Sequence, residues 1–144
     1  MEENIDTFPC FVADTSFMAA YLLNGICDDE LSDCVKDIEY IITHNGQIHV
    51  PQLFWYEIGN ALLCRTRRRN SKQIPLSKAD ARDLMFNLQQ LPIVTDIQST
   101  GEIRQRIFDL ASENGLTYHD ASYLELARRL SVPLKTYDKG LQKV

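Results

Sequence analysis

Short apolar runs alternate with longer amphipathic segments along this chain of 144 residues, and this order limits its possible folds more than any other feature. The runs predicted as strands are residues 10–13, 47–50, 91–97 and 134–137. The segments predicted as helices are residues 17–23, 28–43, 52–69, 78–90, 100–114 and 118–131, with a terminal helical turn at 138–141. Strands that alternate with helices form a mainly parallel sheet covered on both faces. The sequence therefore predicts an α/β fold with three layers, α/β/α.

The composition is that of an ordinary globular protein, with 44% hydrophobic and 24% charged residues. A chain of this length can bury a core without a disulfide or a metal to support it, so we expect a single domain over residues 1–144. No apolar run reaches the roughly 18 residues that a membrane span needs. Residues 1–8 carry three acids instead of the basic start of a signal peptide, so we expect a cytoplasmic protein with no membrane partner.

The cysteines and histidines do not predict a zinc site. The four cysteines are Cys10, Cys27, Cys34 and Cys64. No two of them have the C-x-x-C spacing of a zinc or redox motif. His44 and His49 lie five residues apart across a glycine turn, which suits neither one helical face nor a zinc knuckle. We therefore expect four reduced thiols with mostly structural roles.

Charge is distributed unevenly along the chain, whose net charge is -5. Residues 1–44 hold ten acids and a single base. The bases of the remainder include one cluster, formed by Arg65, Arg67, Arg68, Arg69 and Lys72. An acidic chain does not by its composition indicate a nucleic-acid-binding protein, so a basic surface for RNA has to be local. The cluster fits two interpretations equally, contacts with RNA phosphates or cations that stabilise the C-terminus of the predicted helix.

Three acids are predicted to lie at one edge of the sheet. Asp14 directly follows the first strand, Asp138 follows the last, and Asp120 lies in the first turn of a helix that begins at Thr117. Ligands of open α/β sheets bind at this edge, outside the carboxyl ends of the strands. Each acid alone also fits a structural role, because Asp14 and Asp138 are good N-cap residues and Thr117 with Asp120 forms a capping box.

Glu57 is the acid that capping does not explain. It is the only charged residue between Val50 and Cys64, and an unpaired carboxylate in apolar surroundings would be costly. A solvated stripe shared with Asn60, or a pairing with an arginine, is the alternative explanation. Together with the other three acids, Glu57 favours a site for a hard divalent cation, Mg²⁺ or Mn²⁺. Such a metal can deprotonate a bound water for attack on a phosphodiester.

Four stretches of the chain carry a resemblance to a known family. Residues 12–16 read V-A-D-T-S, and Glu57 lies in an apolar helix after Pro51. Residues 120–127 read D-A-S-Y-L-E-L-A, and residues 136–141 read T-Y-D-K-G-L. In this order and spacing the stretches resemble PIN-domain proteins, most closely the VapC-like toxin ribonucleases of prokaryotic toxin–antitoxin pairs.

The resemblance implies a PIN-like fold with a short, mainly parallel central sheet flanked by helices. It also implies an endoribonuclease that uses Mg²⁺ or Mn²⁺ and leaves 5′-phosphate and 3′-hydroxyl ends. The residues implied to be catalytic and to bind the metal are Asp14, Glu57, Asp120 and Asp138, the last of them directly or through water. The hydroxyls implied to orient these carboxylates or their waters are Thr15, Ser16 and Thr136.

Partners follow from the same resemblance: an RNA substrate, a second copy of the chain in a homodimer, and a small antitoxin whose tail fills the active-site groove. Two alternatives stay open. A housekeeping RNA-processing nuclease would keep the fold and the chemistry but have no antitoxin. A non-enzymatic interaction module would keep the fold alone, and it is disfavoured because none of the four acids is missing.

Aromatic residues close to these acids in sequence receive a structural interpretation. Trp55, Tyr56 and Tyr123 form a helical stripe that we predict to be core or dimer contact, in preference to a surface that stacks on bases. His119 occupies a position where the family often has an aromatic residue, so the resemblance gives it no role.

Overall fold

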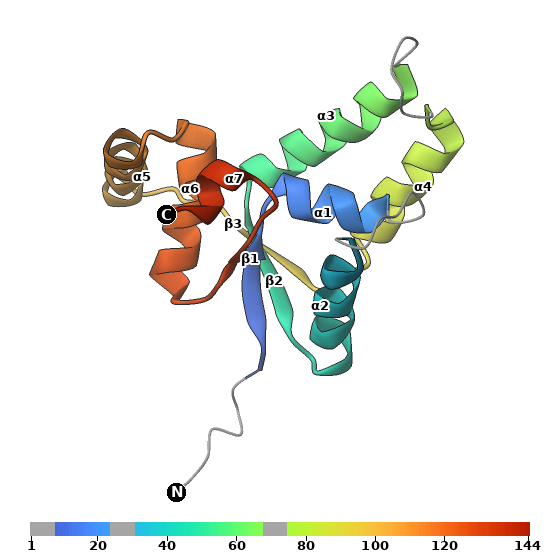
Figure 1. Ribbon diagram of the computed structural model, residues 1–144, viewed down its shortest axis with the longest axis horizontal. Coiled ribbons are helices and arrows are strands. Elements are labelled where there is room, and N and C mark those ends of the chain that lie inside the picture. The colour runs from blue at the N-terminus through green and yellow to red at the C-terminus, as the bar shows by residue number, and fades with distance from the viewer. Residues whose placement is uncertain (1–7, 24–30, 68–74) are drawn as a thin grey trace, which may run out of the picture.

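The computed structural model describes residues 8–23, 31–67 and 75–144. Its strands are β1 (Cys10–Ala13), β2 (Gln47–Pro51), β3 (Ile93–Asp96) and β4 (Leu134–Lys135). Its helices are α1 (Thr15–Leu22), α2 (Leu31–Thr43), α3 (Leu53–Arg67), α4 (Lys78–Leu88), α5 (Gly101–Asn114), α6 (Tyr118–Leu130) and α7 (Lys139–Gln142). Among the described residues, each of the first three strands is followed by two helices and β4 by one (Figure 1).

The strands form one sheet in the order β3-β2-β1-β4, and every pairing in it is parallel. Val12 of β1 pairs with His49 of β2 on one side and with Leu134 of β4 on the other. The register between β2 and β3 continues to the pair of Pro51 and Asp96. The carboxyl ends of the strands therefore lie at the same edge, and the predicted mainly parallel sheet is confirmed.

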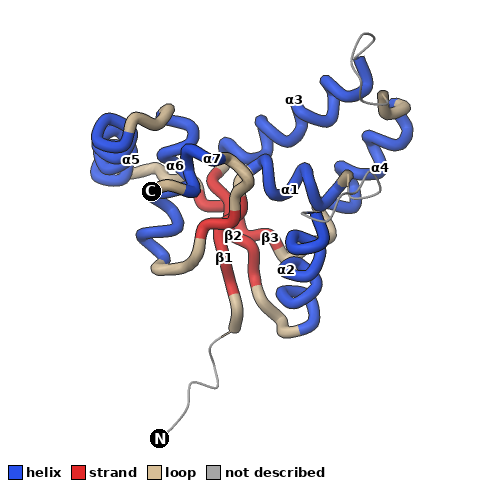
Figure 2. The backbone as a smooth tube through the Cα atoms, viewed as in Figure 1, coloured by secondary structure: helices blue, strands red, loops and turns tan. Residues whose placement is uncertain are grey.

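Helices cover both faces of the sheet, which gives the three layers that the sequence predicts (Figures 1 and 2). On one face α6 contacts β1 and β2, and α5 packs against the outside of α6. On the other face α2 and α3 contact β2, and α1 packs against both of these helices. The pair formed by α3 and α4 extends away from the sheet (Figure 1).

Two strands are shorter than predicted, each for a local reason. β4 stops at Lys135 instead of residue 137 because the Thr136 hydroxyl donates to the carboxylate of Asp14 and the Tyr137 N–H donates to Ser16 Oγ at 3.0 Å. These bonds turn the chain away from β1 and toward the start of α1. β3 begins at Ile93 instead of residue 91, because the proline before it has no N–H to donate to a ladder.

Helix ends are formed by the residues that the sequence identifies as caps. Ser77 Oγ accepts the N–H of Asp80, and Thr117 Oγ1 accepts the N–H of Asp120, both at 3.0 Å. Asp14 and Asp138 are the N-caps of α1 and α7. Gly115 ends α5 in the left-handed conformation, with φ 64°, which glycine adopts without strain. These ends are predictable because a cap depends on only a few neighbouring residues.

The core joins the strands to helices on both faces. The side chains of Val12, Ile48 and Val50 are fully buried in the sheet, and so are helix residues that include Met18, Ile38, Phe54, Ile58 and Leu126. Cys10 and Cys64 are free thiols, Cys34 is buried in the core, and Cys27 lies outside the described residues. No helix in the described ranges combines the length and the apolar character that crossing a bilayer would require.

Gly46, in the turn before β2, generates a prediction about stability. A Cβ at this position would lie 2.3 Å from the Pro9 carbonyl oxygen and 2.9 Å from the Ile41 side chain. Gly46→Ala is expected to lower the free energy of unfolding by about 1–3 kcal/mol, because the backbone has to move. Gly59→Ala in α3 is the control, since a Cβ there meets nothing within 4 Å. This variant is expected to raise the free energy of unfolding by about 0.5–1 kcal/mol, because alanine favours a helix over glycine. Equal effects of the two variants in urea unfolding would contradict this account.

Candidate functional site

The carboxyl edge of the sheet is where the four predicted acids lie. Asp14 directly follows β1, and Asp138 follows β4 by three residues. Glu57 lies near the start of α3, which follows β2, and Asp120 lies in the first turn of α6. The first turns of α1, α3 and α6 are joined at this edge by hydrogen bonds from Thr15 and Tyr123 to Glu57. The parallel topology thus gathers residues that are separated by more than a hundred positions.

Asp14 is the most deeply placed of the four acids, with only 5% of its surface exposed. Its Oδ1 accepts the Phe17 N–H at 3.0 Å and the Ser16 hydroxyl at 2.7 Å, and its Oδ2 accepts the Thr136 hydroxyl. Burial raises the pKa of Asp14, hydrogen bonds from Thr136, Ser16 and Phe17 oppose that rise, and the charge of Asp138 adds to it. Asp14 therefore caps α1 and faces the site with the same carboxylate.

Glu57 is half-buried and is held by two hydroxyl groups. Thr15 Oγ1 donates to Glu57 Oε1 at 2.8 Å, and the Tyr123 hydroxyl donates to the same oxygen at 2.5 Å. Within the described ranges its hydrogen-bond partners come from α1 and α6, and neither is an arginine. Burial and the bond to Glu57 raise the pKa of Tyr123, so the phenol stays protonated and remains a donor.

The pKa of Asp120 is affected by the other three acids. Its pKa is raised first by burial and then by the charge of Asp138, with smaller contributions from the charges of Asp14 and Glu57, while Thr117 opposes the rise. Asp138 itself accepts the Leu141 N–H on Oδ1 at 3.0 Å. Asp120 is thus coupled electrostatically to Asp14, Glu57 and Asp138, and we name these four carboxylates the acid cluster.

Hydroxyl groups surround the acid cluster where the sequence predicts them. Thr15 donates to Glu57, whereas its neighbour Ser16 donates to Asp14. Thr136 donates to Asp14 and accepts the Asp138 N–H at 2.9 Å. In the described part of the chain, no three His, Cys, Asp or Glu side chains stand in a group able to hold a metal ion by themselves. The role of the acid cluster toward a metal stays a prediction.

The members of the predicted basic cluster differ in their exposure to solvent. Arg65 is only 7% exposed, so its guanidinium does not lie on the surface as an RNA phosphate contact requires. Arg65 follows Ile58 and Leu62 at helical spacing and shares their buried face of α3. Arg67 is exposed. The remaining members, Arg68, Arg69 and Lys72, lie outside the described residues.

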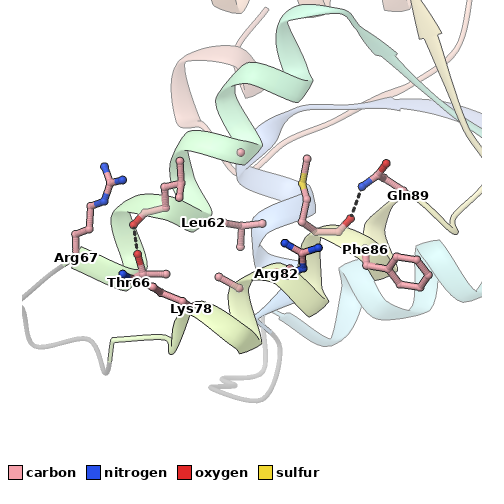
Figure 3. Close-up of a pocket in the computed structure, with 11 residues that line it drawn as sticks. Leu62, Thr66, Arg67, Lys78, Arg82, Phe86 and Gln89 are labelled. Atoms are coloured by element: carbon pink, nitrogen blue, oxygen red, sulfur yellow. Dashed lines mark hydrogen bonds between the residues drawn. The ribbon is translucent and has the colours of Figure 1, made fainter.

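Arg67 lines a groove of about 960 Å³ between α3 and α4 (Figure 3). Its apolar residues are Leu62, Leu63, Ala81, Met85 and Phe86, and its cations are Arg67, Lys78 and Arg82. None of the four members of the acid cluster lines this groove. The groove and the acid cluster are therefore separate features, which share only helix α3.

A buried ionic network on α6 was not predicted from the sequence. Glu125 is 2% exposed and accepts Arg129 Nε at 2.8 Å and Gln98 Nε2 at 2.9 Å. Arg129 also donates to Asp96, the last residue of β3, at 2.8 Å. Burial alone would raise the pKa of Glu125, but the bonds from Arg129 and Gln98, together with the charges of Arg129 and Arg106, lower it overall. The available signal was a Glu and an Arg four residues apart in a helix with an apolar face.

The aromatic stripe has three different environments. Tyr123 is 1% exposed and belongs to the core, Trp55 is half-buried and donates to Thr95 at 2.8 Å, and Tyr56 is exposed. The prediction of a core position is therefore correct for Tyr123. The bond from its hydroxyl to Glu57, however, could not be predicted from the sequence.

Comparisons with known proteins agree with this geometry. A family model described as PIN domain matches residues 11–144. Ribonuclease VapC3 of Pyrobaculum aerophilum is 27% identical over 106 residues, which cover 74% of this chain and 77% of that protein. The crystal structure of PAE2754 from Pyrobaculum aerophilum matches with a TM-score of 0.60 and 25% identity, over 91% of this chain and 76% of that one.

A second solved structure extends the likeness in fold. Mycobacterium tuberculosis VapC20, described as a toxin that cleaves the sarcin-ricin loop, matches with a TM-score of 0.64 and 13% identity. The match covers 92% of this chain and 93% of that one. At this identity the likeness concerns the fold, and it confirms the predicted PIN-like architecture.

The network on α6 generates a prediction about pH. Arg129→Met leaves the Glu125 carboxylate buried with fewer donors, so it is expected to lower the free energy of unfolding at pH 7 by about 3 kcal/mol. Because the folded protein lowers the pKa of Glu125, this stabilisation is present above its ordinary value of 4.5 and is lost as the pH falls below it. The difference from wild type should therefore shrink in acid. Arg128→Met, at an exposed neighbouring position, is the control, and an equal loss in both variants would refute the network's role.

Proposed function

Because this chain belongs to the PIN domain family, we propose that it is a metal-dependent endoribonuclease that hydrolyses RNA phosphodiester bonds with Mg²⁺ or Mn²⁺. The observation that carries the proposal is the acid cluster. Its four carboxylates come from different parts of the chain and meet at the carboxyl edge of a parallel sheet, where α/β proteins bind ligands. Two of the four, Asp14 and Glu57, are held in place by hydroxyl donors.

The donor set fits a hard divalent cation. Carboxylate oxygens are the ligands that Mg²⁺ and Mn²⁺ prefer. Burial raises the pKa of Asp120 most, the charges of Asp138, Asp14 and Glu57 add to the rise, and a cation would relieve the part due to those charges. Mg²⁺ commonly binds one or two carboxylates directly and keeps several waters. On this proposal Asp14 and Asp120 are the principal ligands, with Glu57 beside them and Asp138 acting directly or through water.

A divalent metal, when bound, lowers the pKa of a coordinated water and offsets the charge that builds on the phosphate during in-line attack. Neighbouring residues of the chain fix the orientation of two of the carboxylates. Asp14 is fixed by Ser16, Thr136 and the Phe17 N–H, so its carboxylate cannot rotate away from the site. Glu57 is fixed by Thr15 and Tyr123 in the same way. Two carboxylates fixed in this way do not have to be ordered when a metal binds.

RNA as the substrate, and a toxin role, are supported by the relatives. VapC3 is a ribonuclease, and VapC20 is a toxin that cleaves the sarcin-ricin loop. By this likeness we assign the chain to the toxin half of a toxin–antitoxin pair, with a small antitoxin protein as its partner. A homodimer that works in the cytoplasm completes the proposal. Growth arrest on expression, relieved by co-expression of a neighbouring small reading frame, would distinguish this role from housekeeping RNA processing.

The first experiment is cleavage of a pool of labelled structured and single-stranded RNAs, with Mg²⁺, with Mn²⁺ or with a chelator. Wild type is expected to cleave only with metal. Asp14→Asn and Asp120→Asn are each expected to reduce the rate by about 100-fold or more, because even residues that merely orient metal ligands are worth about 10- to 100-fold. Asp83→Asn on α4 is the matched control and should cleave like wild type. Full activity in either site variant would refute the assignment.

The raised pKa of Asp120, caused first by burial and then by the neighbouring charges, leads to a separate prediction for the metal-free protein. Because folding raises the pKa of Asp120 above its ordinary value of 3.8, its charged form disfavours the fold at neutral pH. Asp120→Asn should therefore be more stable than wild type in the presence of a chelator, and the gain should vanish as the pH falls toward 3.8. Millimolar Mg²⁺ should raise the melting temperature of wild type more than that of the variant. A variant that is less stable than wild type at every pH would contradict this destabilisation of the charged Asp120 by burial and by its acidic neighbours.

A further inference from the structure

Tyr123 lies within the most buried stretch of α6, residues 121–127. A buried tyrosine needs one hydrogen-bond partner for its hydroxyl, and in a packed core this is often a backbone carbonyl. Here the partner is instead the carboxylate of Glu57, at 2.5 Å, and Thr15 Oγ1 lies 3.0 Å from the same hydroxyl. The hydroxyl of the most buried aromatic residue of α6 thus donates a hydrogen bond to a member of the acid cluster.

Three oxygen atoms from three helices lie within hydrogen-bond distance of one another. They are Thr15 Oγ1 on α1, Glu57 Oε1 on α3 and the Tyr123 hydroxyl on α6, separated by 2.8, 2.5 and 3.0 Å. A charged carboxylate only accepts, so both hydroxyls serve as its donors. In the described ranges every hydrogen bond to Glu57 ends on Oε1 and none on Oε2. One oxygen is therefore anchored and the other is directed away from the anchor.

The position of Tyr123 on its helix links two members of the acid cluster. Asp120 precedes Tyr123 by three residues, so the two side chains share one side of α6. The bond from Tyr123 to Glu57 therefore sets where α3 stands relative to the helix that carries Asp120. At the start of α1, two neighbouring hydroxyls hold two different acids in place. Thr15 donates to Glu57, and Ser16 donates to Asp14.

We propose that Tyr123 is a positioning residue of the active site: with Thr15, it anchors one oxygen of Glu57 so that the other is held toward a bound divalent cation or its water. The inference rests on the proposed function and adds to it a role for a residue of the core. Donors to a metal-binding carboxylate fix its orientation, and their loss commonly weakens metal binding by about 10- to 100-fold.

The test measures Mn²⁺ binding by titration calorimetry, with RNA cleavage as a second readout. Tyr123→Phe keeps the ring and removes the hydroxyl, so the variant is expected to fold, to bind Mn²⁺ about 10-fold more weakly or worse, and to lose kcat while KM for RNA is retained. Tyr118→Phe makes the same change on an exposed residue of the same helix and should leave Mn²⁺ binding unchanged. Wild-type Mn²⁺ affinity in Tyr123→Phe would overturn the inference.

A double-mutant cycle tests whether Tyr123 acts through Glu57. In a Glu57→Gln background, Tyr123→Phe should cause no further loss of Mn²⁺ affinity, because the carboxylate that it anchors is already gone. A second full loss would show that Tyr123 acts on the fold as a whole and would overturn the inference. If Tyr123→Phe does not fold, the pair Thr15→Ser and Thr15→Val replaces it, and only the variant that lacks the hydroxyl should bind Mn²⁺ more weakly.

Failure of the inference and failure of the proposed function give different results. A wild-type protein that binds Mn²⁺ and cleaves RNA, beside a Tyr123→Phe variant that does both equally well, overturns only the role of Tyr123. A wild-type protein that binds neither Mn²⁺ nor Mg²⁺ overturns the metal-dependent function and the inference with it.

Discussion

Negative charge gathered at the carboxyl edge of the sheet is the constraint that governs the arrangement of this protein. The parallel order of the strands brings Asp14, Asp120 and Asp138 to that edge, and α3 adds Glu57. Carboxylates at short range repel one another, so each has to be stabilised by donors from its surroundings. Asp14 and Asp138 obtain backbone N–H groups at the starts of α1 and α7, where the helix dipole also favours negative charge. Asp14 and Glu57 receive, in addition, side-chain hydroxyls from elements distant in sequence.

Helix α6 connects this edge to the rest of the molecule. Its first turns carry Asp120 and Tyr123, which face the site, and its later turns carry Glu125 and Arg129, which fasten it to the end of β3. Gln98, in the loop after β3, completes the attachment with bonds to Glu125 and to the Ser122 carbonyl oxygen. Because these bonds join α6 to α3 and to the end of β3, Asp120 and Tyr123 have little freedom to move. The charged network thus contributes to the geometry of the site, although none of its members belongs to the acid cluster.

Features set by nearby residues could be predicted from the sequence, and features set by distant partners could not. The alternation of strands and helices, the caps at Asp14 and Thr117, and the meeting of the acids at one edge follow from local patterns and the topology rule for parallel sheets. The bond from Tyr123 to Glu57 depends on how α3 and α6 pack, which no local pattern encodes. Arg65 is an intermediate case, because its spacing from Ile58 and Leu62 could have placed it on the buried face of α3.

Exposure increases across the acid cluster in an order that fits the proposed RNA substrate. Asp14 is buried and rigidly bonded, Glu57 and Asp120 are half-buried, and Asp138 is exposed. A buried member at one end can define the position of a metal, whereas an exposed member at the other lies where a substrate approaches. The groove between α3 and α4 is lined by none of the four acids. Chemistry on an open edge suits a phosphodiester within a long polymer, since such a bond cannot be enclosed in a deep pocket without folding the strand around it.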